Sequence, residues 1–156
     1  GTCVCPVLDA GRCLLVEVQA LVNPTTSPQP QRRVAGLDPN RVAMVLAVLT
    51  RRLGLPLGQA DVFVNVTGGV RVQEPAADLA LALAIASSLR GIAVPSDLVA
   101  FGEVGLGGEL RPAARYDARA AEARRLGFQK LLAPGGGQGR GRLVATRIDA
   151  AVEMAF

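Results

Sequence analysis

An unbroken apolar run constrains the fold of this chain more than any other feature. Residues 79–86 are all Leu, Ala or Ile, and Pro75 stands ahead of them, where the first turn of a helix accepts proline. A helix that is apolar on every side cannot face water, so we expect this one to lie buried. The run is far too short to cross a bilayer, which needs about 20 apolar residues.

The remaining segments predict strands and helices in a mixed order. The stretches "TCVCPVL" and "RCLLVEVQALV" predict an antiparallel hairpin around Asp9, Ala10 and Gly11. Asp38 and Pro39 predict the start of a helix that runs to Leu53. Further predictions are an interior strand over 61–66, two short strands about a turn at 105–108, a helix over about 117–126, strands over 130–134 and 143–147, and a helix over 148–156. The sequence predicts one α+β domain without internal repeats.

Glycines mark the predicted ends of three helices, in the runs Leu53-Gly54-Leu55, Arg90-Gly91-Ile92 and Leu126-Gly127-Phe128. A left-handed glycine followed by an apolar residue that folds back on the last turn is the Schellman pattern. Two segments predict loops. Residues 23–33 contain three prolines and no apolar side chain, so we expect an exposed, mobile loop, and residues 135–141 predict a flexible one.

Composition narrows the function classes. Half of the residues are apolar, which is ample for a core, but only 3% are aromatic, which argues against a base-stacking platform of the RNA-recognition type. The net charge of +4, carried by arginines and the single lysine Lys130, is compatible with an anionic partner. Because the chain has no His, it cannot build imidazole metal sites or His-dependent catalysis by itself. No signal peptide is visible, and we expect a cytoplasmic protein without membrane contact.

The cysteines are Cys3, Cys5 and Cys13. Cys3 and Cys5 share one face of the first predicted strand, and no CxxC pair is present for zinc. We therefore expect buried, inert thiols in a reducing compartment and no metal site.

Motifs of nucleotide-dependent enzymes fail on context. A P-loop needs a glycine-rich run ahead of its lysine, and Lys130 has none. The glycine turn at 105–108 opens no helix, so it is not a dinucleotide fingerprint. Glu74 and Asp78 at a helix start favour capping over acid–base work. Glu103 and Glu109 flank the glycine turn and are expected on different faces.

Serine nucleophiles without histidine need a nearby base, usually lysine. Ser87 and Ser88 lie in the predicted buried helix, where we expect them to bond back to the helix itself. Ser27 and Ser96 lie in loops without an adjacent base. No catalytic pair can be assembled from these residues.

One family matches this order of segments. The stretches "DVFVNVTGG", "EPAADLALALA" and "DLVAFGEVGLGGELRPAARYDARAAEARRLGFQKLLAP" resemble the proteolytic domain of Lon and, more closely, the Lon-like C-terminal domain of the bacterial RadA (Sms) family of DNA-repair ATPases. The resemblance covers almost the whole chain and is most specific over 61–134. It implies the α+β fold of the Lon proteolytic domain, which is ribosomal protein S5 domain 2-like, with an N-terminal hairpin and a mixed sheet packed with helices.

The resemblance also implies lost chemistry. The catalytic serine of Lon lies in a Gly-Pro-Ser-Ala-Gly run at a helix start, and the matching run here is Glu74-Pro75-Ala76-Ala77-Asp78, so Ala76 holds the place of the serine. The lysine base of Lon lies five residues after a proline that follows the glycine hairpin, and that count from Pro112 reaches Asp117. A methyl group cannot attack a carbonyl, and a carboxylate at neutral pH only accepts hydrogen bonds. We therefore expect no peptidase activity.

The same resemblance implies the rest of the protein. Residues 1–156 would be one Lon-like domain from the C-terminal part of a longer chain, with the zinc ribbon and the RecA-like ATPase of the family, and their Zn, ATP and Mg, lying outside it. The family implies a hexameric ring that binds DNA during recombinational branch migration and a RecA recombinase as partner, in the cytoplasm at the nucleoid.

Arginines are the residues that could hold DNA, since their planar fork suits phosphate. The candidates are Arg32, Arg33, Arg71, Arg111, Arg115 and Arg119, with Arg124, Arg125, Arg140 and Arg142 as further options. Arg115 and Arg119 share a helix face, and Glu122 could neutralise Arg119. Two alternatives remain: an active peptidase with an unrecognised nucleophile, and an assembly module without DNA contact.

Overall fold

The strands of the chain form a mixed sheet and a small hairpin in a computed structural model that describes residues 1–137 and 139–156. They are β1 (Thr2–Asp9), β2 (Arg12–Pro24), β3 (Arg32–Ala35), β4 (Ala60–Val66), β5 (Leu98–Ala100), β6 (Glu103–Val104), β7 (Leu110–Arg111), β8 (Lys130–Ala133) and β9 (Arg142–Val144). Seven of them form one mixed sheet in the order β3-β4-β2-β1-β5-β8-β9, and β6 pairs with β7. The edges of the described sheet are therefore β3 and β9.

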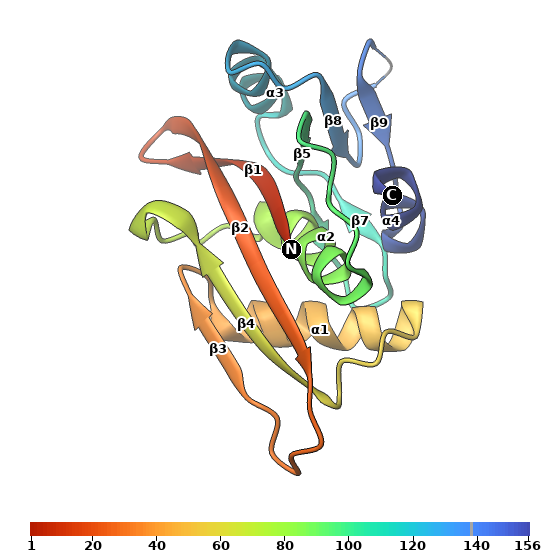
Figure 1. Cartoon of the computed structure of the whole chain (residues 1–156). Coiled ribbons are helices and arrows are strands. Elements are labelled where there is room, and N and C mark those ends of the chain that lie inside the picture. The colour runs from red at the N-terminus through yellow and green to blue at the C-terminus, as the bar shows by residue number, and fades with distance from the viewer. Residues whose placement is uncertain (138) are drawn as a thin grey trace.

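The helices are α1 (Pro39–Leu53), α2 (Asp78–Arg90), α3 (Tyr116–Arg125) and α4 (Ile148–Ala155), with the short 3₁₀ turns η1 (Thr67–Gly69) and η2 (Pro75–Ala77). Figure 1 shows α2 behind the β1–β2 hairpin, with α1 running alongside it. No helix within the described residues is long and apolar enough to cross a membrane. The order and pairing of these strands and helices confirm the predicted α+β class, with a leading hairpin and a mixed sheet packed with helices.

The apolar run is buried, as predicted. Every residue from 79 to 86 is at most 1% exposed. One side of α2 packs on the inward face of β1 and β2, where Cys5 lies opposite Val16 and Cys3 opposite Val18. The helix also contacts α1 and α4, so it has protein on several sides. An all-apolar helix fits only such a position.

The three glycine stops are confirmed. Gly54, Gly91 and Gly127 have φ values of 66°, 66° and 94°. After Gly91, the Ile92 N–H donates to the Ser87 carbonyl at 3.2 Å, and after Gly127, the Phe128 N–H donates to the Ala123 carbonyl at 3.0 Å. These bonds close the last helical turns as the Schellman pattern requires.

The predicted loop over 23–33 is wrong at both ends. β2 extends to Pro24, and Arg32 and Arg33 belong to β3, which pairs in parallel with β4. Residue Val62 of β4 donates to the Gln31 carbonyl at 2.9 Å. The partner of β3 comes from a segment about 30 residues away, which explains why the local pattern gave no strand signal.

Other boundaries also differ. The predicted strand ahead of the glycine turn divides into β5, which joins the large sheet, and β6, which pairs with β7. The strand predicted over 143–147 ends at Val144. The flexible loop predicted over 135–141 includes Gln138, which lies outside the described residues.

The serines Ser87 and Ser88 do not bond back to their own helix turn, contrary to the prediction. The Ser87 hydroxyl donates to the Ile92 carbonyl beyond the helix end at 2.6 Å. The Ser88 hydroxyl accepts from the Val22 N–H of β2 at 2.9 Å. Both serines connect α2 to its neighbours instead.

Candidate functional site: the entrance to α2 and the arginine surfaces

The entrance to α2 is closed by backbone contacts. Ala76, in η2, is 5% exposed, and its carbonyl accepts a hydrogen bond from the Gly102 N–H at 2.8 Å. The Cys5 thiol lies 3.8 Å from the same carbonyl. Position 76 thus presents a buried methyl group and offers no nucleophile.

A buried ion pair stands immediately before this entrance. The Arg119 guanidinium of α3 donates to the two carboxylate oxygens of Glu74 at 2.7 and 2.8 Å. Arg119 also donates to the carbonyls of Pro6 and Ala114, each at 2.8 Å. With Arg119 only 1% exposed, this pair joins α3, β1 and the start of η2 in one hydrogen-bonded unit.

A second ion pair lies at the first turn of α2, where neither Glu74 nor Asp78 makes the capping hydrogen bond that the sequence predicted. Asp78 is 3% exposed, accepts from the Val104 N–H at 3.1 Å and pairs with Arg41 of α1. Burial raises the pKa of the Asp78 carboxyl. The hydrogen bond that Arg41 donates to Asp78 raises the pKa of the Arg41 guanidinium. For Asp78 the effect of burial on the pKa exceeds that of Arg41, because its carboxylate is almost fully enclosed.

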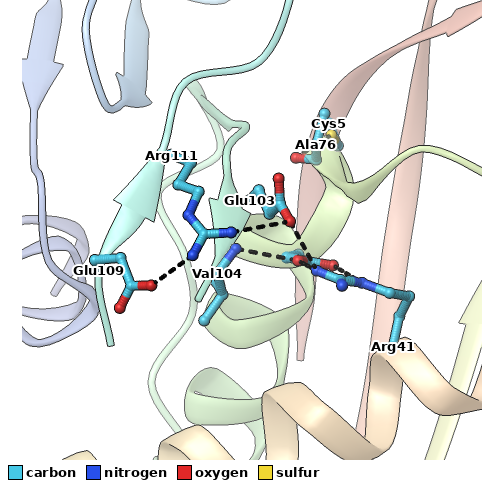
Figure 2. Close-up of polar contacts among 8 residues, drawn as sticks. Cys5, Arg41, Ala76, Glu103, Val104, Glu109 and Arg111 are labelled. Carbon is cyan, nitrogen blue, oxygen red and sulfur yellow. Dashed lines mark hydrogen bonds and ion pairs between the residues drawn. The ribbon is translucent and has the colours of Figure 1, made fainter. Parts of the chain in front are cut away.

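Figure 2 shows that the second pair continues into a chain of charges along the β6–β7 hairpin. Glu103 lies 3.9 Å from Arg41 and 3.7 Å from Arg111, and Arg111 donates to Glu109 at 2.9 Å. The register places Glu103 opposite Arg111, and Glu109 lies two positions before Arg111, so the two glutamates share a face, contrary to the prediction of different faces, and Arg111 lies between them. The alternation of signs removes the repulsion that like charges would cause.

Asp117, at the position where the resemblance expects a lysine, is exposed in the first turn of α3. A carboxylate there suits the positive end of the helix. Position 76 thus carries Ala and position 117 carries Asp, and the Glu74–Arg119 pair lies next to the start of η2.

The thiols of β1 are enclosed. Cys3 and Cys5 are 1% and 0% exposed, which confirms the prediction for them. Burial raises the pKa of Cys3 to about 12 and raises that of Cys5 well above its ordinary value. Cys13 is only partly buried, although burial also raises its pKa. Within the described residues no three His, Cys, Asp or Glu side chains gather as a metal site.

Two of the predicted DNA-contact arginines are already engaged. Arg119 is enclosed by Glu74 and backbone carbonyls, so a phosphate cannot reach it. Glu74, and not the Glu122 that the sequence suggested, is its partner; Glu122 pairs with Arg125 at 2.6 Å. Arg32 lies on the surface, but its guanidinium donates to the carbonyls of Gln31, Leu57 and Ala60.

The other four predicted arginines are exposed. Arg111 shares its charge with Glu103 and Glu109, and Arg115 donates to the Gly11 carbonyl at 3.2 Å. Within residues 1–137 and 139–156, the side chains of Arg33 and Arg71 make no ion pair or hydrogen bond. These two retain their full capacity for an anion.

Arg33 and Arg71 belong to one side of the molecule. Arg33 is on edge strand β3, and the residue after Arg71, Val72, donates to the Gly36 carbonyl just beyond β3 at 2.8 Å. Arg71 also lines a hollow of about 310 Å³ with Asp38 and Pro39 at the start of α1. Further along α1, Arg41 lies 3.9 Å from Glu103, which in turn lies 3.7 Å from Arg111.

Sequence reasoning missed Arg41, whose partner Asp78 is 37 positions away, too far for any local spacing rule to indicate. It also ranked Arg124, Arg140 and Arg142 below the first six, although the structure gathers these three around one hollow.

Known proteins match this chain under two descriptions. A family model described as subunit ChlI of Mg-chelatase matches residues 38–136. A protein named DNA repair protein RadA from Aquifex aeolicus is 51% identical over 134 residues, which is 86% of this chain and 30% of the relative. Proteins of the same name from a Synechocystis strain and from Pseudomonas aeruginosa are 45% and 44% identical, over 89% and 100% of this chain and 28% and 36% of the relatives.

The chain therefore spans about a third of the length of these relatives. The match to the family model covers well over half of it, and includes α1, the entrance to α2 and α3. Over 86% to 100% of its length the chain is similar to a segment of proteins named DNA repair protein RadA, and by the family-model match it belongs to the family described as subunit ChlI of Mg-chelatase.

Proposed function

We propose that this chain is the non-catalytic, Lon-like domain of a RadA-type DNA repair protein, in which it binds DNA and helps to assemble the oligomer. The observation that supports this most strongly is the identity of 43% to 51% with proteins named DNA repair protein RadA, over 86% to 100% of the chain. Identity at this level across a whole domain indicates a shared fold and a related role.

The absence of peptidase chemistry rests on the entrance to α2. Ala76 has no nucleophilic atom, Asp117 has a carboxylate where a base would be needed, and Arg119 with Glu74 is committed to structure. Acyl transfer by this class of site requires an activated hydroxyl and a base within hydrogen-bond reach. In this proposal the segment before α2 serves to pack η2 against β1 and α3.

DNA binding rests on exposed guanidinium groups. Arg33 lies on edge strand β3, and the segment of Arg71 is hydrogen-bonded to Gly36 just beyond that strand. Arg111 belongs to the chain of ion pairs that begins at Arg41 of α1. Arg115 lies apart, beside the turn of the β1–β2 hairpin. A DNA backbone that follows the β3 edge would meet Arg33 and Arg71 first, and would compete with Glu109 for Arg111.

The proposal extends to the rest of the protein. RadA-type relatives are about three times as long as this chain. We place the ATPase that uses ATP and Mg, and the zinc ribbon, in the segments beyond it. The assembled protein would be a cytoplasmic, nucleoid-associated hexameric ring that works on branched or single-stranded DNA with a RecA recombinase as partner.

Two assays on the purified chain test this proposal. Fluorescence anisotropy with labelled single-stranded and duplex DNA, at low and moderate salt, should show binding that weakens as salt rises. Incubation with an unfolded protein substrate should yield no fragments. Absence of binding at low salt would favour a pure assembly module, and cleavage that survives repurification and disappears with one substitution would favour an active peptidase. Sedimentation of the same sample should show self-association.

A further inference from the structure

A hollow rich in arginine lies beside β9, at the sheet edge opposite β3. It has a volume of about 690 Å³ and is lined by Arg124 from α3, Arg140 and Arg142 from the start of β9 and the residues before it, and by Phe128 and Gln129. Since β3 and β9 are the two edges of the sheet, this hollow is distinct from the surface of Arg33 and Arg71.

In residues 1–137 and 139–156, the arginines of the hollow are not paired with a carboxylate. The nearby carboxylates are Glu122 and Asp97, and each already faces another cation, Arg125 at 2.6 Å and Lys130 at 3.6 Å. Within the described part of the chain, no carboxylate forms an ion pair with any of the three arginines that line the hollow. Three guanidinium groups around one volume repel each other unless an anion enters.

The hydrogen-bonding capacity of the three arginines is also largely unused. Among the described residues, the Arg124 guanidinium donates once, to the Arg140 carbonyl at 3.3 Å, and Arg142 donates once, to the Gly136 carbonyl. The Arg142 Nε is buried without any partner among the described residues. Each guanidinium carries five N–H donors, so most of them remain available.

The hollow is held in shape by packing. The Arg142 guanidinium lies over the Tyr116 ring, 5.2 Å from its centroid, which orients one wall through a cation–π contact. The hydrogen bond of Arg124 to the backbone of residue 140 joins the end of α3 to the segment before β9. The walls therefore come from two parts of the chain that the fold brings together.

We propose that this hollow binds phosphate groups of a DNA backbone through Arg124, Arg140 and Arg142. A guanidinium fork matches the two free oxygens of a phosphodiester, and a run of phosphates supplies one negative charge per nucleotide to three fixed cations. This inference rests on the proposed DNA-binding function and adds a second contact surface, at the β9 edge, to the one at β3.

The test compares salt dependence in matched variants of the chain. Arg124→Gln/Arg140→Gln removes two charges from the hollow, and Arg12→Gln/Arg51→Gln removes two exposed arginines elsewhere. With single-stranded DNA, the hollow variant should lower the magnitude of the slope of log K against log salt by about 1.4, since each phosphate contact contributes about 0.7. Its Kd at low salt should rise about tenfold or more, because hydrogen bonds between charged groups are lost. The control variant should keep the parent slope.

A second arm identifies the source of the phosphate. Inorganic phosphate, titrated against chloride at equal ionic strength, should shift the arginine Nε NMR signals of the hollow in the parent, and added DNA should displace the free phosphate and move the same signals to the positions of the DNA-bound state. Phosphate shifts with an unchanged DNA slope would assign the hollow to a free phosphoryl ligand and overturn the DNA contact.

The two proposals fail separately. If the parent binds DNA, but the hollow variant keeps its slope and phosphate shifts no signal, the hollow is not a phosphate site while the proposed function stands. If the parent does not bind DNA at all, the proposed function fails in its DNA-binding part. The DNA assignment of the hollow fails with it, and the response to inorganic phosphate then shows whether a phosphate site remains.

Discussion

Arg119 and Glu74 form a two-bonded ion pair, with N–O distances of 2.7 and 2.8 Å, at the entrance to the buried helix α2. The pair brings α3 against β1 and against the start of η2, since Arg119 also donates to the Pro6 carbonyl at 2.8 Å. Arg119, which the sequence analysis assigned to DNA, therefore connects α3 to β1 and η2 inside the protein.

Removal of Glu74 should be costly. Glu74→Ala leaves the Arg119 charge enclosed without its partner, which typically lowers the free energy of unfolding by about 3–5 kcal/mol. Urea unfolding followed by circular dichroism measures the loss. Glu122→Ala breaks the exposed pair with Arg125 and serves as control, with a much smaller expected loss, because solvent screens an ion pair on the surface. Equal losses for the two variants would contradict the assignment of Glu74–Arg119 as the main tie.

Asp78 should make stability depend on pH. Burial raises the pKa of its carboxyl in the folded protein, so the folded state holds the proton more tightly than the unfolded state. The resulting stabilisation is present below the ordinary Asp pKa of about 3.9 and is lost as pH rises through the higher folded value. Relative to the parent, Asp78→Asn should therefore gain stability as pH rises from about 3 to about 6. A carboxyl titration by NMR with a midpoint below the ordinary value would reverse this sign.

The thiols should react unequally. At pH 8 Cys3 and Cys5 are protonated and enclosed, because burial raises the pKa of Cys3 to about 12 and that of Cys5 well above its ordinary value. A chromogenic disulfide reagent should modify Cys13 alone in the folded chain and all three cysteines in urea. Rapid modification of Cys3 or Cys5 without denaturant, located by mass spectrometry, would show that β1 opens easily.

A serine at position 76 should not restore peptidase activity. Ala76→Ser supplies a hydroxyl, but the position is 5% exposed and Asp117 cannot act as the lysine base of a Ser-Lys pair. Release of fragments from a fluorescent unfolded substrate should stay at the level of the parent chain. If the single substitution produced turnover that a serine-directed inhibitor blocks, a base must lie near residue 76 that the geometry does not reveal.

Local signals predicted much of the fold. Asp38, Pro39 and Gly54 delimited α1, and the continuous apolar run indicated the buried α2, because capping and helix burial depend on neighbouring residues. β3 was missed because its strand character comes from pairing with β4, and an exposed edge strand needs no apolar pattern. The ion pairs of Arg119 and Arg41 were missed for a related reason, since their acidic partners lie 45 and 37 positions away in the sequence.

The salt dependence of DNA binding at the β3 edge tests the central claim most directly. Arg33→Ala/Arg71→Ala should lower the magnitude of the slope of log K against log salt by about 1.4 on single-stranded DNA and by about 1.8 on duplex DNA. Arg32→Ala, which removes a neighbouring arginine already bonded to backbone carbonyls, should leave the slope unchanged. An unchanged slope in the double variant, or a loss in Arg32→Ala as large as in the double variant, would contradict the account.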